Sequence, residues 1–139
     1  MKEDGLRRVE AELGLTLPGD YRRLLLTLPF TPVGGDRVYR LYDDPREVIR
    51  ATRSPVSEFH EGRSWRPAYV AIGETAMGDQ YVLDLPRTPS PVLCLSHETH
   101  EVGDEFPDLP AFVAAWTEDV AEAGGRHERA ERWWRFWRR

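Results

Sequence analysis

A β-hairpin is predicted at the centre of the sequence, in the stretch AIGETAMGDQYVLDL at residues 71–85. After the glycines of this stretch, successive side chains alternate between two faces. One face carries Tyr81, Leu83 and Leu85, and the other carries Gln80, Val82 and Asp84. A two-residue period of this kind is typical of a strand with one buried and one exposed face. The chain around it must therefore supply further strands and a layer that covers the apolar face.

The glycines of this stretch are interpreted as turn residues. A phosphate-binding glycine loop is followed by a helix, whose amides and dipole face the anion. Here a strand pattern follows, and no lysine is nearby in the sequence. We therefore expect Gly73, Gly78 and Asp79 to form a structural turn. Gly78 would have a backbone φ that a side chain opposes, and Asp79 would accept hydrogen bonds from neighbouring amides.

Two amphipathic helices are predicted in the first 30 residues. Leu6, Val9 and Leu13 have the spacing of one helical face. Gly14 follows them and is placed to end the helix in the left-handed conformation. Pro18 is accepted in the first turn of the second helix. The apolar stripe of that helix consists of Tyr21, Leu24, Leu25 and Leu28.

Strands and two more helices complete the predicted fold. Residues 37–42, 68–73 and 91–96 have strand composition, in addition to residues 80–85. Asp44 and Asp108 are predicted N-caps of helices. The inner stripe of the last of these helices consists of Leu109, Phe112, Val113, Trp116 and Val120. The pattern predicts an α+β fold: a single domain with a mainly antiparallel sheet, flanked by N-terminal and C-terminal helices.

Charge divides the chain into an acidic body and a basic tail. The net charge is −5, but residues 126–139 contain six arginines and two glutamates. Residues 1–125 therefore hold 13 basic and 22 acidic residues, a balance of −9. We expect residues 1–125 to form the domain and residues 126–139 a helical extension. An acidic body argues against nucleic-acid binding, which depends on neutralising phosphates, and suits a basic protein partner.

No catalytic or metal site is predicted. In HETHE, at 97–101, the two histidines are three residues apart, whereas a helical zinc pair needs four, and His60 is the only other candidate ligand. Cys94 lies in an apolar strand and is expected to be an unreactive core residue. Because the carboxylates show no pairing that singles out an acid and a base, we expect a protein that is not an enzyme and has no cofactor or metal.

The tail is the least ordinary part of the sequence. It contains Trp133, Trp134 and Trp137 among its arginines. Tryptophan and arginine are typical of protein interfaces, so packing on the domain itself or a homodimer contact is favoured. The alternatives are that the tail binds another protein partner, a membrane or a nucleic acid.

The sequence predicts a cytoplasmic location. No apolar run approaches the roughly 18 residues of a membrane span, and the N-terminus lacks the apolar core of a signal peptide.

Four blocks carry a resemblance to a known family. VEAELGLTLPGDYRRLLL, at 9–26, resembles the helix–turn–helix opening of the SMI1/KNR4 superfamily, also called SUKH. YVAIGETAMGDQYVLDL, at 69–85, resembles its central hairpin. PVLCLSHE, at 91–98, is similar to the next strand, and FPDLPAFVAAW, at 106–116, to the closing helix. The blocks occur in the family order, and the tail after residue 125 departs from the family pattern.

The resemblance implies an α+β fold without catalysis. Many bacterial members act as immunity proteins that neutralise a toxin domain, and fungal members act as regulatory scaffolds. We therefore expect an immunity protein that occludes the active site of a basic toxin domain. The alternative is a regulatory or scaffold module that self-associates through its tail. The expected partner-binding residues are loop acids with one aromatic anchor: Asp36, Asp43, Asp44, Glu58, Glu61, Trp65, Glu98, Glu101, Asp104 and Glu105.

Overall fold

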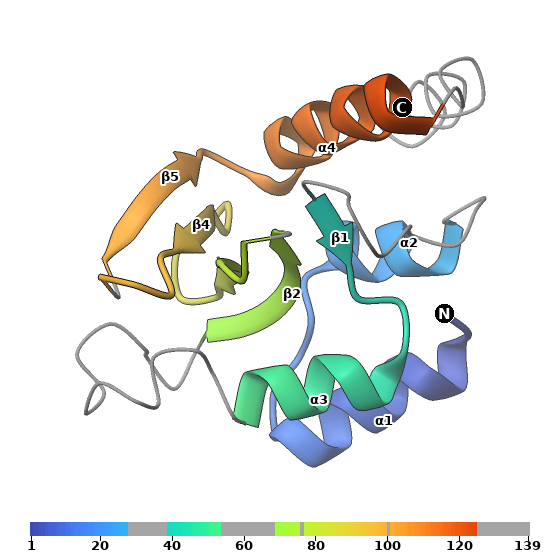
Figure 1. The fold of residues 1–139 in the computed structure, drawn as a ribbon. Helices are drawn as coiled ribbons and strands as arrows, with labels where there is room; N and C mark the ends of the chain where they lie inside the picture. The colour runs from blue at the N-terminus through green and yellow to red at the C-terminus, as the bar shows by residue number, and fades with distance from the viewer. Residues whose placement is uncertain (28–38, 54–68, 76, 100, 125–139) are drawn as a thin grey trace.

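A computed structural model describes residues 1–27, 39–53, 69–75, 77–99 and 101–124 of the chain (Figure 1). Within these ranges the elements follow one another as α1 (Glu3–Leu13), α2 (Gly19–Thr27), β1 (Tyr39–Leu41), α3 (Pro45–Arg53), β2 (Tyr69–Thr75), β3 (Gln80–Asp84), β4 (Val92–Leu95), β5 (Val102–Phe106) and α4 (Leu109–Gly124). The predicted α+β class is confirmed.

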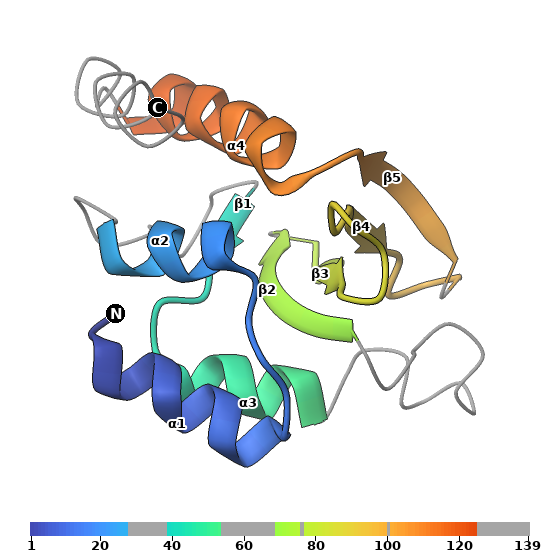
Figure 2. The ribbon, with the colours of Figure 1, turned by 180° about the vertical axis from the view of Figure 1, so that it is seen from behind.

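The strands form one antiparallel sheet in the order β1-β2-β3-β4-β5. Each strand pairs with the next one described along the chain, so the β2–β3 and β4–β5 connections lie at the same end of the sheet. In Figures 1 and 2, α1 and α3 lie side by side, and β2 lies between this pair and α4. Helices from both ends of the chain therefore flank the sheet, as the sequence predicts.

Side-chain and glycine caps set the helix boundaries. Gly14 ends α1 with φ 66°, and its N–H donates to the carbonyl oxygen of Glu10. Asp44 accepts a hydrogen bond from the Arg46 amide at 2.8 Å, at the start of α3. Asp108 accepts one from the Ala111 amide at 2.9 Å, at the start of α4. Each carboxylate satisfies a first-turn amide that has no partner within its own helix.

The main core lies between the sheet and the helices. The buried stripe predicted for the closing helix is present in α4, where Leu109, Phe112, Val113 and Trp116 are all buried; the side chain of Val120 lies outside the described residues. Leu6 and Val9 of α1, and Tyr21, Leu24 and Leu25 of α2, join the same cluster. Trp116 and Tyr21 are among the largest fully buried side chains described. The helical apolar spacing thus identified these buried residues, whereas the predicted Leu13 is only partly buried and the predicted Leu28 lies outside the described residues.

The prediction that β3 is buried on one face only is wrong. All five residues of β3 are buried. Tyr81 and Leu83 belong to the main core, whereas Val82 packs with Tyr69, Leu93 and Leu95 in a second cluster. Gln80 and Asp84 are buried as well. The two-residue period therefore assigned the side chains to the correct faces but did not reveal that both faces are covered.

Two further expectations need correction. Gly73 is not a turn residue: it lies within β2, where the pairing with β3 shifts in register between Ala71 and Gly73. β5, with the sequence VGDEF, was not predicted as a strand because glycine and acidic residues are poor strand formers. Pairing with β4 places it in the sheet, so Asp104 and Glu105 lie in a strand and not in a loop.

Within the part of the chain that is described, no helix is both long enough and apolar enough to cross a bilayer.

Candidate protein-binding surfaces

Two turns meet at one end of the sheet. In the β2–β3 turn, the carbonyl oxygen of Thr75 accepts a hydrogen bond from the Gly78 amide at 3.1 Å. The Thr75 hydroxyl accepts another from the Asp79 amide, also at 3.1 Å. Gly78 has φ 94°, a conformation that glycine adopts without the strain a side chain would add. The turn is thus closed by its own backbone and by one threonine.

The carboxylate of Asp79 joins this turn to the β4–β5 connection. Its Oδ1 accepts a hydrogen bond from the His97 amide at 3.0 Å and lies 2.7 Å from Nδ1 of the His97 ring. We had expected Asp79 to bond the amides of its own turn, but it bonds a residue 18 positions away. The histidine is therefore held by a carboxylate rather than standing free on the surface, and the two turns form one ordered unit.

The environment of Asp79 favours its charged form. Partial burial raises the pKa of this carboxyl group. The hydrogen bonds from the His97 amide and ring, together with the ring's charge, outweigh burial, so the pKa lies below its ordinary value. At neutral pH the turn therefore carries a negative charge in addition to those of its neighbours.

We call the exposed part of these two turns the turn surface; it consists of Met77, Glu98, Thr99 and Glu101. The Met77 side chain is 74% exposed and is one of two large exposed hydrophobic residues described. The Ser96 hydroxyl accepts hydrogen bonds from the amides of Glu98 and Thr99, each at 3.2 Å. The turn surface thus carries one exposed apolar side chain and two exposed carboxylates.

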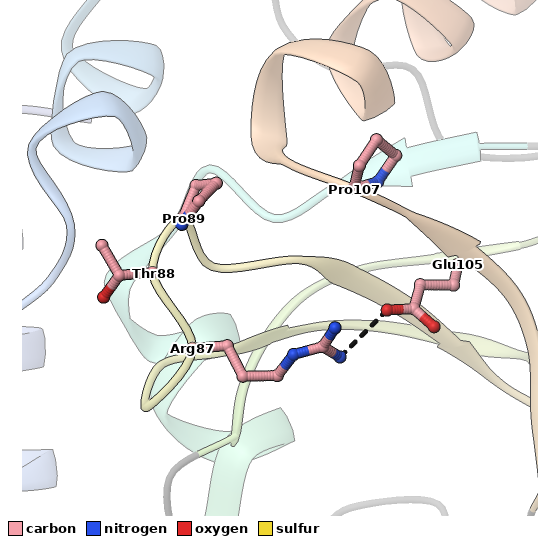
Figure 3. Close-up of a pocket in the computed structure, with 5 residues that line it drawn as sticks. All are labelled: Arg87, Thr88, Pro89, Glu105 and Pro107. Atoms are coloured by element: carbon pink, nitrogen blue, oxygen red, sulfur yellow. Dashed lines mark hydrogen bonds and ion pairs between the residues drawn. The ribbon is translucent and has the colours of Figure 1, made fainter.

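A second surface lies at the opposite end of the sheet, where a pocket of about 490 Å³ opens. Its lining consists of Arg87, Thr88, Pro89, Glu105 and Pro107. Figure 3 shows Arg87, from the β3–β4 connection, pointing toward Glu105 of β5. Nη1 of Arg87 lies 2.9 Å from Oε1 of Glu105 and 4.0 Å from Oδ2 of the buried Asp84. The sequence had pointed to Glu105 but not to Arg87, because nothing in the local pattern links residues 18 positions apart.

Those predicted partner-binding residues that the structure describes lie in three separate places. Glu98 and Glu101 lie in the turn surface, and Glu105 lies beside the pocket. Asp43 and Asp44 precede α3, where Asp44 pairs with Arg46 at 3.0 Å. Asp104 lies in β5, and its side chain is not described. Asp36, Glu58, Glu61, Trp65, Trp133, Trp134 and Trp137 lie outside the described residues.

In the described ranges, no group of three or more His, Cys, Asp or Glu side chains could hold a metal ion. His60 and His100 lie outside those ranges. Cys94 is buried in β4, in the core position that its apolar neighbours predict.

Comparison with known proteins gave one family. The sequence model of the SMI1 / KNR4 family (SUKH-1) matches residues 1–115, which include all five strands, helices α1–α3 and the first part of α4. No curated protein and no solved structure matches the chain.

Proposed function

Because the chain belongs to the SMI1 / KNR4 family (SUKH-1), we propose that it is a non-catalytic protein-binding domain that acts as an immunity protein. In this role it neutralises a cognate bacterial toxin by covering the toxin's active site. The family match over residues 1–115 is the observation that carries the proposal. The exposed acidic side chains indicate what kind of toxin surface the protein would cover.

Charge supports a basic partner. Residues 1–125 have a balance of −9, and acids are exposed at both ends of the sheet, with Glu98 and Glu101 at one end and Glu105 at the other. Toxin domains that act on nucleic acids carry basic active sites, since they must bind phosphates. An acidic domain would dock over such a site and be steered toward it during diffusion.

Occlusion requires a surface that keeps its shape, because ordering side chains and loops on binding reduces affinity. The Asp79–His97 contact links the two turns of the turn surface, and the Arg87–Glu105 pair connects the two sides of the pocket. Both contacts are already made in the unbound chain. In this mechanism the protein supplies no reacting group and acts by excluding the toxin's substrate.

The test is capture of a partner followed by a neutralisation assay. Tagged full-length protein is used to isolate partners from the source cells, and each captured protein is then expressed alone and together with this chain. We expect a basic protein that is toxic alone, is harmless in the pair and purifies with this chain as a stoichiometric complex. A captured partner that is equally toxic in both cases would contradict the proposal.

A regulatory module that self-associates through its tail is the second candidate. The Trp/Arg-rich residues 126–139 lie beyond the family match and outside the described residues, so their composition alone supports this role. Full-length protein with Trp133, Trp134 and Trp137 all changed to alanine would be monomeric if the tail forms a dimer. An unchanged solution mass would rule out the dimer contact.

A further inference from the structure

β5 is an edge strand. It pairs with β4 on one side through Leu95↔Val102, Leu93↔Glu105 and Val92↔Phe106. On its other side no strand pairs with it in the parts of the chain that are described, and it lies at the outside of the sheet in Figure 1. An edge strand presents backbone N–H and C=O groups to which an extended segment can add.

The edge is held in position before any partner binds. The ring of Phe106 lies 5.4 Å from that of Phe112 of α4 and 6.4 Å from that of Tyr81 of β3. On the same strand, Glu105 is tied to Arg87 of the β3–β4 connection. β5 is thus anchored to a helix and to a connection as well as to β4, and a partner strand would add to an ordered template.

The pocket lies at the C-terminal end of β5, between Glu105 and Pro107 on one side and the β3–β4 connection on the other. The rings of Pro89 and Pro107 supply apolar walls, and the Arg87–Glu105 pair supplies the polar part (Figure 3). In the connection that carries Arg87, the Ser90 hydroxyl donates to the Arg87 carbonyl oxygen at 3.0 Å. A volume of about 490 Å³ is ample for one large side chain.

Charge decides between two possible occupants of the edge. Glu101, Asp104 and Glu105 place three carboxylates on or next to β5. Pairing of two β5 strands from two copies would bring these like charges together, which is unfavourable across strands. A basic segment would instead place opposite charges across the new pair. The edge therefore favours a basic partner over a second copy.

We propose that a lysine- or arginine-rich extended segment of a protein partner adds to β5 as a further strand and inserts an apolar side chain into the pocket between Pro89 and Pro107. This inference rests on the proposed function, since it specifies which surface receives a basic partner. Backbone hydrogen bonds to β5 supply affinity, and the pocket with its neighbouring carboxylates selects the segment.

The probe is a synthetic peptide of alternating lysine and valine with one central tryptophan, compared with its glutamate counterpart. Each peptide is added at about 1 mM to the full-length protein, and amide hydrogen exchange is followed at residues 102–106; this concentration detects weak binding. We expect the lysine peptide to slow exchange in β5 and the glutamate peptide to have no effect. Glu105→Lys should weaken binding of the lysine peptide roughly threefold to tenfold, since one favourable cross-strand contact becomes repulsive.

Glu98→Lys is the matched control, because it reverses an equal charge on the turn surface, where His97 is the only described ionic partner of Glu98, at 3.8 Å. It should leave peptide binding within about twofold of the original, since an exposed charge away from the edge has a small effect. The proposal would be overturned if neither peptide slowed amide exchange in β5, or if both peptides slowed it equally. It would also be overturned if Glu98→Lys abolished this protection and Glu105→Lys did not. If amide exchange in β5 slowed without any peptide as the solution mass doubled, β5 would instead pair with β5 of a second copy, which would also overturn the proposal.

The immunity role and the β5 binding site can each be disproved without disproving the other. A toxin that is neutralised and bound equally well by the original protein and by Glu105→Lys would place its interface elsewhere, and the immunity role would stand without the β5 site. Conversely, β5 protection by the lysine peptide, with no toxic protein captured from the source cells, would leave the binding edge in place and remove the immunity role.

Discussion

Asp79 and His97 join two turns that lie 18 residues apart in the chain, through a 2.7 Å contact between Oδ1 and ring Nδ1 and a 3.0 Å hydrogen bond from the His97 amide. The contact places the β2–β3 turn against the β4–β5 connection. The order of the turn surface therefore depends on this pair.

Replacing Asp79 with asparagine should destabilise the protein. The variant loses a charge-assisted contact to His97, and we expect about 1 to 3 kcal/mol less stability at pH 7 in urea unfolding. Glu98→Gln is the control, because the Glu98 side chain is 76% exposed and should contribute little. Equal stability of the two variants would show that the Asp79–His97 contact does not hold the turns together.

The stabilising effect of Asp79 should depend on pH. Its folded-state pKa lies below the ordinary value of 3.8, so its contribution is fully present above that value. The contribution is lost as the pH falls through the lowered folded-state pKa. The difference in unfolding free energy between the original protein and Asp79→Asn should therefore shrink as the pH falls below the ordinary carboxyl pKa of 3.8. A difference that grew below that pH would contradict this sign.

Gly78→Ala should cost about 1 to 3 kcal/mol of stability, because φ 94° is strained for any residue with a side chain. Space is not the reason, since an added Cβ would lie 3.8 Å from the nearest His97 ring atom, an ordinary contact. Gly19→Ala at the start of α2 is the comparison: its Cβ would meet nothing within 4 Å, and its φ is not positive. We expect Gly19→Ala to leave the thermal midpoint unchanged or to raise it.

Tyr21→Phe should not destabilise the protein. The Tyr21 hydroxyl is buried and has no hydrogen-bond partner among the described residues. Burial, together with the neighbouring Tyr42, raises the pKa of Tyr21 far above its ordinary value. Removing a buried hydroxyl without a partner should leave stability unchanged or raise it by about 1 kcal/mol. Tyr42→Phe removes a 3.1 Å hydrogen bond to Glu74 and should lower stability by about 1 kcal/mol in the same chemical unfolding experiment.

Arg22 should contribute more to stability than other arginines of the N-terminal helices. From α2 it hydrogen-bonds to both Glu3 and Glu10 of α1, and its side chain is largely covered. We expect Arg22→Met to lose about 1 to 2 kcal/mol, because two carboxylates lose a shared partner. Arg7→Met is the control, since Arg7 is 73% exposed and lies 3.9 Å from Glu3. Stability is measured by unfolding in urea. If both variants lost the same unfolding free energy, the bridging role of Arg22 would be contradicted.

The sequence by itself determined the local structure. Helix limits at Gly14, Asp44 and Asp108 were predictable because caps act within a few residues of the helix end. The buried stripe of α4 followed from helical spacing, and the family followed from four short blocks in order. In each case the interacting residues are near one another in the chain, so their pattern is visible before folding.

Tertiary structure alone decided the rest. Pairing with β4 made a strand of β5, and the packing of both faces buried all of β3. The contacts Asp79–His97 and Arg87–Glu105 each span 18 residues, so neither appears as a motif. The acids predicted from composition and loop placement have no periodicity, and among the described residues they lie in separate places. Contacts between strands depend on register, which is set by the face that each strand buries and by the turns that join the strands, so the partners of a given residue appear only once the sheet has formed.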